Sequence, residues 1–347
     1  MKKIIHLVDS MERGGQEKFI LDLAISQKKK GFDVIILCLF KLGVFAKLAI
    51  KNKIQVYAVS EEVINYFQRI TNLKKILDDE KPDVLHTHNR SPLIFSVLAK
   101  PYHSYKLINT RHGNGVRGLY WSLSALFADK IINVSSDLFT ESNLINRFLI
   151  KSKNRVIKNG IEINDKISNG TNIGQLIIVG RLNPIKNHLL ALNIVAECVK
   201  QCIPIKLLIV GDGPSRSEIE KHINELKITD NVQLLGDRAD VNELLLESDI
   251  FLLTSFSEGH SIALLEASAS GLPALVTNVG GNAEIIQNKI TGWVFDLAEI
   301  SKFVLKIKEL IRNRDLRHKT SLNAKEWALN NVSIDACADR YIKEYFS

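Results

Sequence analysis

Two glutamates in the stretch SEGHSIALLEASASG, residues 257–271, stand where a carboxylate needs specific partners. Glu258 precedes a small-residue apolar segment with the composition of a buried helix, and Glu266 lies inside that segment, eight positions later. A charged side chain among leucines and alanines is costly unless hydrogen-bond donors reach it. The donors could belong to a ligand, or to the protein itself, as a helix cap at Glu258 and a buried ion pair at Glu266.

A pair of cations follows an apolar strand in the second half of the chain. In VGRLNPIKNHLLAL, Arg181 and Lys186 lie five residues apart around Pro184, directly after Gly180. At a strand-to-helix turn the arginine can fork two phosphate oxygens while the lysine acts as a point charge, so the two can embrace a diphosphate. A solvated loop is the alternative interpretation.

Glycines point to anion binding, but not to the common nucleotide motifs. Gly14 and Gly15, in DSMERGGQEKFILDLA, leave the N–H groups of a helix N-terminus open to an anion. There is no G-x-x-x-x-G-K-[ST] loop, and in GDGPSRS Arg216 stands where the dinucleotide pattern needs its third glycine. No D-x-D pair is present to hold a divalent ion. We therefore expect no metal and no cofactor, with charge neutralised by Arg, Lys and helix ends.

Three histidines stand at strand ends in the first half. His86 and His88, in HTHNRS, are two residues apart, so both project from one face of a strand, and His112 ends the next strand in NTRHGN. A metal site built from the three is conceivable, but no carboxylate accompanies them in sequence. For His86 we expect a packed strand residue.

The elements that must position these residues alternate between strand and helix. Apolar strands are predicted at KKIIHLV, FDVIILCLF, IQVYAVS, DVLHTH, YKLINTR, KIINVSS and RVIKNG, and then at QLIIVGRL, IKLLIVGDG, NVQLLGD, DIFLLTS and PALVTNVG. Continuous apolar strands separated by helices imply parallel sheets covered on both faces, here two doubly wound α/β domains. Ligands of such sheets bind outside the C-terminal strand ends, where the candidate residues lie.

Domain boundaries follow from composition. The segment KNGIEINDKISNGTNIG, residues 158–174, is polar and rich in Asn and Gly, as linkers are. It predicts one domain over 1–160 and another over 161–332, a division that 347 residues favour because a single core rarely grows so large. The amphipathic tail, residues 333–347, is expected to return to the first domain as a crossover helix.

Bulk properties bound the cellular context. Apolar runs are too short to cross a bilayer and the N-terminus lacks a secretion signal, which favours a cytosolic protein, and the four scattered cysteines predict reduced thiols. Residues 1–160 carry 26 Lys and Arg against 14 Asp and Glu, whereas residues 161–347 carry 20 against 24. The basic half predicts an anionic partner, lipid or nucleic acid, unless its lysines are merely solvated. No zinc finger, RNA-binding signature or helix-turn-helix is present, so nucleic acid is not expected.

Five motifs occur in an order that resembles one known family. GG near the start, GRL with a lysine five residues after its arginine, GDGP, SEG with E-x7-E, and NVGGNAEII extend from Gly14 to Glu284. This order resembles the family-four retaining glycosyltransferases of the GT-B fold. The resemblance implies two Rossmann-like domains facing each other across a cleft. The first would bind an acceptor and the second a nucleotide-sugar donor, with the C-terminal helix crossing back to the first.

The resemblance also assigns roles. It places Glu258 on the hydroxyls of the transferred sugar and Glu266 on the ribose, and a vicinal diol can satisfy either carboxylate. His112 falls close to the reacting sugar carbon, where a neutral imidazole can either hydrogen-bond a sugar hydroxyl or stabilise developing positive charge, and His88 falls on the acceptor side. The expected catalytic residues are His112, Arg181, Lys186 and Glu258, and the expected donor-binding residues are Gly14, Gly15, Gly180, Gly211, Arg238, Gly259, His260, Ser261, Ile262 and Glu266.

Donor recognition is expected from backbone groups. The helix start GHSIALL supplies N–H groups for phosphate oxygens, and GDRADV, residues 236–241, supplies those that read the base. The sequence departs from the commoner family wording at His260 and Ser261, where an aromatic residue and a second glycine often follow Glu-Gly. The hydroxyl of Ser261 remains a candidate hydrogen-bond donor to a phosphate oxygen. The family's sugar contacts at these two positions do not carry over directly to His260 and Ser261.

The missing carboxylates bear on mechanism. A double displacement needs an acid on the ring face opposite the leaving group, and no Asp or Glu stands beside HTHN or RHGN. The family resemblance implies a same-face reaction in which the departing diphosphate oxygen takes the acceptor's proton. Arg181 and Lys186 then stabilise the leaving group electrostatically.

These observations predict a retaining, metal-independent transferase that uses a UDP-hexose or UDP-N-acetylhexosamine and a saccharide or lipid-linked acceptor. The segment VRGLYWSLSALFADK, residues 116–130, has aromatic and basic residues that suit peripheral contact with the anionic inner membrane leaflet, unless its aromatics pack in the core. Two alternatives stay open. One is a nucleotide-sugar 2-epimerase of the same architecture, and the other is a non-catalytic nucleotide-sugar binding subunit.

Overall fold

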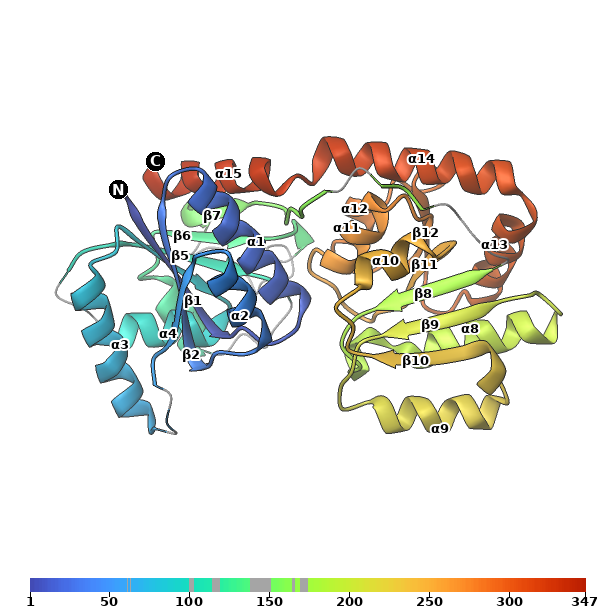
Figure 1. The fold of residues 1–347 in the computed structure, drawn as a ribbon, viewed down its shortest axis with the longest axis horizontal. Helices are drawn as coiled ribbons and strands as arrows, with labels where there is room; N and C mark the ends of the chain where they lie inside the picture. The colour runs from blue at the N-terminus through green and yellow to red at the C-terminus, as the bar shows by residue number, and fades with distance from the viewer. Residues whose placement is uncertain are drawn as a thin grey trace. The chain divides into compact units, whose positions relative to one another are not determined.

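The protein folds into two α/β units. The structure is a computed structural model that describes residues 1–60, 62, 64–99, 103–113, 119–137, 151–163, 166–168 and 174–347. Residues 1–160 and 334–347 form the first unit, and residues 161–333 form the second (Figure 1). The chain therefore passes between the units twice, and a parallel bridge joins Ile161 to Ser333 beside the two passages.

The described residues of the first unit form one parallel sheet with the strand order β3-β2-β1-β4-β5-β6-β7. The order reverses between β1 and β4, which pair from Ile4 with Val84 to Leu7 with Thr87. In open sheets of this kind, ligands bind at the C-terminal strand ends near such a reversal. The strands are β1 (Lys3–Ser10), β2 (Asp33–Lys41), β3 (Gln55–Ala58), β4 (Val84–His88), β5 (Lys106–Arg111), β6 (Lys130–Asn133) and β7 (Asn154–Val156).

Helices cover both faces of this sheet, which is why its strands are continuous apolar runs. On one face α1 contacts α2 and α15, and on the other α4 contacts α3 and α5 (Figure 1). The helices of the unit are α1 (Gly15–Lys29), α2 (Val44–Lys51), α3 (Tyr66–Glu80), α4 (Arg90–Ala99), α5 (Leu119–Ala125) and α15 (Ile334–Phe346), with a 3-10 turn, η1 (Lys151–Lys153).

The second unit repeats this plan with the strand order β10-β9-β8-β11-β12-β13, again parallel, so the reversal lies between β8 and β11. Helix α8 contacts α9 and α13, while α11 contacts α10, α12 and α14. The strands are β8 (Gln175–Val179), β9 (Lys206–Val210), β10 (Val232–Gly236), β11 (Ile250–Leu253), β12 (Ala274–Thr277) and β13 (Gly292–Phe295). The helices are α8 (His188–Lys200), α9 (Arg216–Leu226), α10 (Val241–Leu246), α11 (Ile262–Ala269), α12 (Asn282–Ile285), α13 (Ile300–Arg312) and α14 (Arg314–Asn331), with η2 (Pro184–Lys186) and η3 (Thr229–Asn231).

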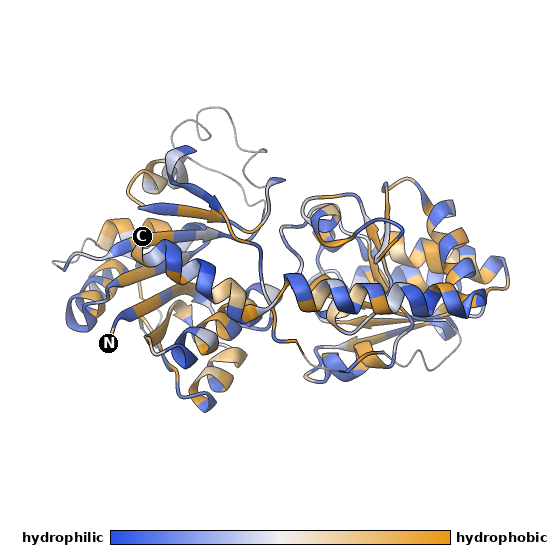
Figure 2. Cartoon of the chain, turned by 90° about the horizontal axis from the view of Figure 1, so that it is seen from above, coloured by the Kyte–Doolittle hydropathy of each residue, from blue (hydrophilic) through white to orange (hydrophobic). Residues whose placement is uncertain are grey.

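The C-terminal helix returns to the first unit, as the amphipathic tail predicts. Tyr341 and Tyr345 of α15 are fully buried, and the hydroxyl of Ser26 in α1 donates to Asp335, 2.6 Å away. Hydrophobic residues concentrate in the strands (Figure 2), and each unit has a core cluster of buried apolar residues. The prediction of two doubly wound α/β domains with a crossover helix is confirmed.

One strand was not predicted from the sequence. Strand β13 has only four residues, too few for a clear pattern, and it begins at Gly292. A Cβ on this glycine would collide with the backbone of Ala274 in the neighbouring strand β12, so only glycine permits the close pairing.

Across the described part of the chain, no helix has the length and apolarity that crossing a membrane requires.

Candidate active site

The candidate site of the second unit lies at the reversal of its sheet. Strand β8 ends at Val179, and the loop that follows carries Gly180 and Arg181. A Cβ on Gly211, at the end of β9, would collide with the carbonyl oxygen of Gly180, and Gly211 has a φ of +129° that favours glycine. The glycine of GDGP therefore lets two strand-end loops approach closely, and this approach holds the loop that bears the arginine.

The two predicted cations differ in their surroundings. Arg181 is exposed, and its guanidinium has no hydrogen-bond or ion-pair partner among the residues that the structure describes. Lys186 ends the turn η2, where the side chain of Asn183 accepts a hydrogen bond from its backbone N–H at 3.1 Å. Its ammonium group lies 2.7 Å from Oε1 of Glu258. One cation is thus free to meet an anion, and the other is already held in place.

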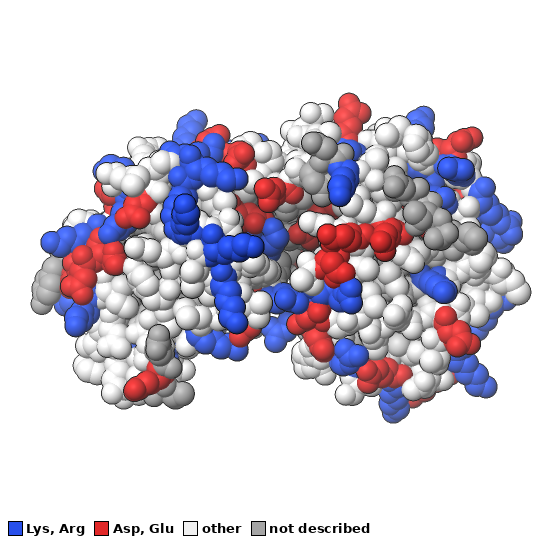
Figure 3. All heavy atoms as spheres, in the orientation of Figure 1, with Lys and Arg blue, Asp and Glu red and all other residues white. Residues whose placement is uncertain are grey.

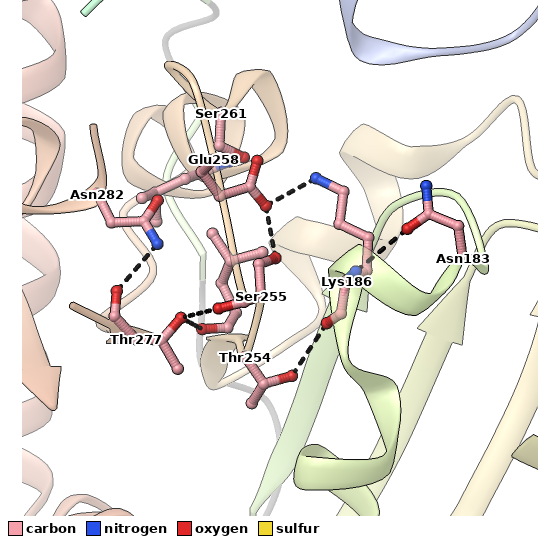
Figure 4. A network of polar contacts seen from close by, with 10 residues as sticks. Asn183, Lys186, Thr254, Ser255, Glu258, Ser261, Thr277 and Asn282 are labelled. Atoms are coloured by element: carbon pink, nitrogen blue, oxygen red, sulfur yellow. Dashed lines mark hydrogen bonds and ion pairs between the residues drawn. The ribbon is translucent and has the colours of Figure 1, made fainter. Parts of the chain in front are cut away.

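Glu258 is buried, and donors of the protein reach its carboxylate (Figure 4). Its Oε1 accepts hydrogen bonds from Lys186 at 2.7 Å and from the hydroxyl of Ser255 at 2.5 Å. No described residue bonds its Oε2. For Glu258 the family resemblance implies a sugar contact, and a helix cap is the alternative. The structure shows an ion pair between Glu258 and Lys186, because the β8 and β11 loops bring residues 72 positions apart together.

The helix start that follows is capped by a serine. Ser261 is the N-cap of α11, and its Oγ accepts from the N–H of Leu264 at 3.4 Å. The first intrahelical bond runs from Leu265 to the carbonyl of Ser261, so helix geometry leaves the N–H groups of Ile262 and Ala263 without an intrahelical acceptor. The serine hydroxyl keeps its own hydrogen to donate. This arrangement suits phosphate oxygens, as the sequence predicts for Gly259 to Ile262.

Three further polar residues, which the sequence analysis did not single out, fix this loop. Thr254 donates to the carbonyl of Asn187 at 3.0 Å, Thr277 donates to the carbonyl of Ser255 at 2.7 Å, and Asn282 donates to the carbonyl of Thr277 at 3.0 Å (Figure 4). All three are fully or almost fully buried. A signal was present, since Thr254 and Thr277 each end or follow an apolar strand, but their acceptors are backbone atoms of distant loops.

The NVGG turn supports Glu258 from the other side. Gly280 has a φ of +49°, and a Cβ there would collide with the carbonyl oxygen of Glu258, while the N–H of Gly281 bonds the carbonyl of Gly259 at 2.9 Å. We expect Gly280→Ala to lower the free energy of unfolding by about 2–3 kcal/mol, through backbone strain and the forced shift of Glu258. Urea denaturation measures this. Gly113→Ala, where a Cβ meets no atom within 4 Å, is the control, and equal losses in both variants would contradict the prediction.

Two other predicted donor-binding residues, Glu266 and Arg238, are less buried than Glu258. Glu266 is half-buried within α11. Arg238 is exposed and pairs with Asp240 through two hydrogen bonds, of 2.8 and 2.5 Å. This pairing raises the pKa of Arg238 and lowers that of Asp240. The loop that holds them follows Gly236, whose carbonyl accepts from Gly211, so it lies beside the β9 end of the site.

In the first unit, the predicted glycines begin α1. Gly14 is its N-cap, with extended backbone, and Gly15 is its first residue. Glu17 lies in the first turn, and its carboxylate stands where a Cβ on Gly14 would be. An acidic side chain therefore already faces this helix N-terminus, and an anion bound here would have to displace it.

Hydrogen bonds of side-chain amides join the strand ends of the first unit. Asn89, at a φ of +67°, accepts from the backbone N–H of His112 at 3.1 Å, and its amide donates to Gln16 at 2.5 Å. Asn109 in β5 donates to the carbonyl of Asn89 at 2.8 Å. These bonds fix the loop after β4 against the end of β5, and so they fix the backbone of His112.

The histidines form a buried cluster, and it includes one that the sequence analysis missed. His86 and His88 project from one face of β4, as their spacing predicts, and their ring centroids lie 4.1 Å apart. His6 of β1 joins them, with Nδ1 3.0 Å from Nε2 of His88. His112 follows β5, with Nε2 3.0 Å from Nδ1 of His88. A histidine within the apolar run KIIHLV gave no sign of a polar partner, because strand order alone places β1 beside β4.

Burial keeps these histidines neutral. It lowers the pKa of His6 to about 4 and that of His112 to about 3. The pKa values of His86 and His88 fall well below the ordinary range for the same reason, and neighbouring histidines depress them further. His86 is a packed strand residue, as predicted.

The predicted acceptor-side position of His88 needs revision in one respect. Its ring is fully buried, and both nitrogens are bonded to other histidines, so no ring nitrogen is left for a direct contact with an acceptor. His112, which is only half-buried, is the member of the cluster nearest to solvent.

Three ring nitrogens, one each from His6, His86 and His88, lie within 4.8 Å of one another. By distance alone, they could ligate one metal ion. Each of the three rings already has both nitrogens in hydrogen bonds. No carboxylate of a described residue bonds them, so a divalent ion would bring an uncompensated charge into the core. The donor set fits a neutral hydrogen-bonded cluster better than an ion.

Family models match both halves of the sequence. Residues 161–327 match the model described as glycosyl transferases group 1, and residues 13–165 match the model described as glycosyltransferase family 4. Among curated proteins, the UDP-Gal:alpha-D-GlcNAc-diphosphoundecaprenol alpha-1,3-galactosyltransferase of Escherichia coli is 28% identical over 318 residues, which cover 81% of this chain and 80% of the relative. The N-acetyl-alpha-D-glucosaminyl L-malate synthase of Bacillus anthracis is 28% identical over 304 residues, covering 80% and 77%.

Solved structures share the fold over the whole chain. The Anabaena protein Alr3699/HepE in complex with UDP superposes with a TM-score of 0.84 at 20% identity, covering 99% of both chains. A glycosyltransferase from Rickettsia africae superposes with a TM-score of 0.82 at 23% identity, covering 99% of this chain and 98% of its own. At these identities the likeness concerns the fold, which is the two-domain GT-B arrangement of Rossmann-like sheets.

Proposed function

The chain belongs to the family 4 glycosyltransferases of the GT-B fold, and from this premise we propose that it transfers a hexose or N-acetylhexosamine from a UDP-sugar to a saccharide or lipid-linked acceptor. The proposed setting is the synthesis of bacterial cell-surface polysaccharide or lipopolysaccharide. The E. coli relative is named for a UDP-sugar donor and a diphosphoundecaprenol acceptor, and this supports both parts of the proposal.

One observation carries the proposal for the donor. At the strand-order reversal of the second unit, Arg181 has no partner among the described residues, while Lys186 is held beside it by Glu258. The ammonium group of the lysine spends one of its three donors on the carboxylate and keeps two. Together with the N-terminus of α11, these cations would meet the two phosphates of a nucleoside diphosphate.

Glu258 would bind the transferred sugar through Oε2, which no described residue bonds. Its Oε1 is occupied by Lys186 and Ser255, so Oε2 would accept the sugar hydroxyls. The ion pair would then place the sugar and the leaving phosphate at a fixed spacing. Such positioning lowers the barrier because reacting groups need not be ordered at the moment of reaction.

We propose a retaining, metal-independent reaction on one face of the sugar. The bond between the anomeric carbon and the diphosphate oxygen breaks, the acceptor oxygen bonds to the same face, and the acceptor's proton moves to the departing diphosphate. Arg181 and Lys186 would stabilise the charge that develops on the leaving group. His112 would contact the transferred sugar.

A donor screen followed by a transfer assay tests the function. We expect UDP and one UDP-sugar to raise the melting temperature, because a ligand that binds only the folded state stabilises it. With a membrane extract as acceptor, the labelled sugar should appear in a lipid or saccharide product whose anomeric configuration, read by NMR, matches the donor. Formation of an epimer from the donor alone, or binding without transfer to any acceptor, would contradict the proposal.

We also propose that the first unit contacts anionic lipid. The segment proposed from sequence, residues 116–130, lies partly outside the described residues, and of its described part Leu123 and Phe127 are exposed. A second surface lies on α2, where Leu48 and Ile50 are exposed beside the exposed Lys47 and Lys51. On the face in Figure 3, basic side chains form a band down the first unit.

Vesicle flotation checks the membrane proposal. The protein should float with vesicles that contain anionic phosphatidylglycerol and much less with phosphatidylcholine alone, and salt should weaken the binding. Leu48→Ser should reduce the bound fraction severalfold, because α2 loses apolar area at the lipid surface. Leu322→Ser, at an exposed leucine of the second unit, serves as the control. Equal binding to neutral and anionic vesicles would contradict the proposed role of the basic unit.

A further inference from the structure

A continuous chain of hydrogen bonds runs from α1 to His112. The side-chain oxygen Oε1 of Gln27 lies 2.7 Å from Nε2 of His6, Nδ1 of His6 lies 3.0 Å from Nε2 of His88, and Nδ1 of His88 lies 3.0 Å from Nε2 of His112. Gln27, His6 and His88 are fully buried, so water does not share these bonds. The chain ends at Nδ1 of His112, which is itself buried and has no partner among the described residues.

The hydrogens of this chain are determined by its first member. A neutral imidazole has one N–H donor and one bare acceptor nitrogen. The amide nitrogen of Gln27 donates to the hydroxyl of Tyr345 at 3.2 Å, which turns its oxygen toward His6. An amide oxygen can only accept a hydrogen bond. His6 therefore carries its hydrogen on Nε2 and leaves Nδ1 without a hydrogen. His88 must then donate from Nε2 to His6, and His112 must donate from Nε2 to His88.

A side branch is consistent with the same assignment. The hydroxyl of Tyr345 accepts from Gln27 and donates to Nδ1 of His86, 2.6 Å away. His86 then carries its hydrogen on Nε2 and donates to the hydroxyl of Thr110 at 2.7 Å, which donates onward to Tyr341 at 3.3 Å. Each histidine N–H in the two branches meets one acceptor.

The opposite amide orientation is less favourable. If the nitrogen of Gln27 faced His6, each histidine in the chain would have to reverse, and His112 would carry its hydrogen on Nδ1. That N–H would be a buried donor with no partner among the described residues. An unsatisfied buried N–H is rarer in proteins, and costlier, than an acceptor that lacks a donor. The orientation seen in the structure avoids this cost.

We propose that Gln27 is a positioning residue that fixes His6, His88 and His112 as Nε2–H tautomers, so that His112 presents a bare Nδ1 to accept a hydrogen bond from a hydroxyl of the bound sugar. This use of the lone pair rests on the proposed transferase function, whereas the tautomer assignment does not. Burial lowers the pKa values of all three histidines, so the chain stays neutral and directional near pH 7. A protonated His112 would be a donor on both nitrogens and could not accept.

Nitrogen-15 NMR of protein labelled at histidine tests the tautomers directly. In the wild-type protein at pH 7.5, long-range proton–nitrogen spectra should show three neutral rings with the hydrogen on Nε2, identified by the loss of one ring's signals in each of His6→Gln, His88→Gln and His112→Gln. If His112 carries its hydrogen on Nδ1, or is doubly protonated, the proposal is overturned even if the protein is an active transferase. This readout needs no substrate and no altered Gln27.

Two variants of Gln27 test the positioning role. Gln27→Met keeps the volume but removes the acceptor, so His112 should show a mixture of tautomers, and kcat should fall about three- to tenfold, the range of one lost hydrogen bond. KM should change less than twofold. Gln27→Glu retains an oxygen toward His6 and should keep the Nε2–H tautomers. Gln55→Met, on exposed β3, is the control and should leave both readouts unchanged.

A fluorinated donor separates the tautomer effect from a general loss of structure. In the wild type, a UDP-sugar whose contacting hydroxyl is replaced by fluorine should react about three- to tenfold more slowly, because fluorine cannot donate. In Gln27→Met the same replacement should have little further effect. An unchanged tautomer of His112 in Gln27→Met, or full additivity of the two changes, would overturn the positioning role while leaving the transferase proposal intact.

Discussion

Replacing Arg181 with alanine is expected to lower kcat at saturating donor about 10²- to 10³-fold, the cost of removing one group that stabilises developing negative charge. The guanidinium is exposed and has no partner among the described residues, so its loss breaks no contact of the resting protein. Saturating donor removes any effect on binding alone. A reduced kcat then reports stabilisation of the transition state.

The variant should fold normally, because surface substitutions away from buried features have small effects on stability. A thermal melt checks this. Arg181→Lys should recover part of the activity, since lysine keeps the charge but cannot fork two phosphate oxygens. Arg314→Ala, at an exposed arginine of the same unit, is the control. An Arg181→Ala enzyme with wild-type kcat would refute the assignment of the diphosphate to this loop.

The fold was predictable because most of its buried strands appear in the sequence as runs of apolar residues. Strands such as KKIIHLV and IKLLIVGDG are covered on both faces, so most of their buried side chains are apolar. Strand β13 escaped because four residues beginning with Gly292 carry no periodicity. Short edge elements depend on their neighbours rather than on their own sequence.

The candidate site was predictable in its members but not in their pairing. Lys186 and Glu258 were both expected at the strand ends, but as separate contacts to a ligand, and the sequence did not indicate that they bond each other across 72 positions. Ser255 was hidden for the same reason, since its partner is the side chain of Glu258. Pairing depends on which strand ends are neighbours, and here β8 lies beside β11.

The histidine cluster shows the same limit. The spacing of His86 and His88 predicted a common face, which the structure confirms. His88 bonds His6 of β1, His86 bonds Tyr345 of α15, and His6 in turn bonds Gln27 of α1. No local pattern links these segments, because the contacts depend on the strand order and on the return of the C-terminal helix.

Mild acid is expected to unfold the first unit before the second. Four histidines of the first unit, His6, His86, His88 and His112, have folded pKa values below the ordinary value near 6.5, about 4 for His6 and about 3 for His112. Below pH 6.5 these histidines bind protons in the unfolded chain but not in the folded unit. Their contribution to the free energy of unfolding is therefore fully present above this pH and is lost as the pH falls. Among the described residues of the second unit, His188 and His260 are buried, and burial lowers the pKa of His188 to about 4.

The expected size follows from one pKa unit being worth about 1.4 kcal/mol. At pH 5.5 each of the four histidines costs the first unit about 1.4 kcal/mol, or about 5–6 kcal/mol together, which is comparable with the whole stability of many domains. Burial raises the pKa of Asp9, and this opposes the loss, since such an acid gains stability as the pH falls. The lowered pKa values of Glu80 and Asp83 matter only below their ordinary values of 4.5 and 3.8, outside this range.

Urea unfolding at pH 7.5, 6.5 and 5.5, followed by a short hydrogen-exchange pulse at one common pH and mass spectrometry of peptides, measures each unit separately. Peptides from residues 1–160 should show a midpoint that falls steeply with pH, while those from residues 174–333 should shift less, because two buried histidines, His188 and His260, stand in this range against the four of the cluster. The second unit thus serves as an internal control for general effects of acid. Equal shifts in the two sets of peptides would mean that the histidine cluster does not stay neutral in the folded protein, and the hydrogen-bonded chain that ends at His112 would lose its physical basis.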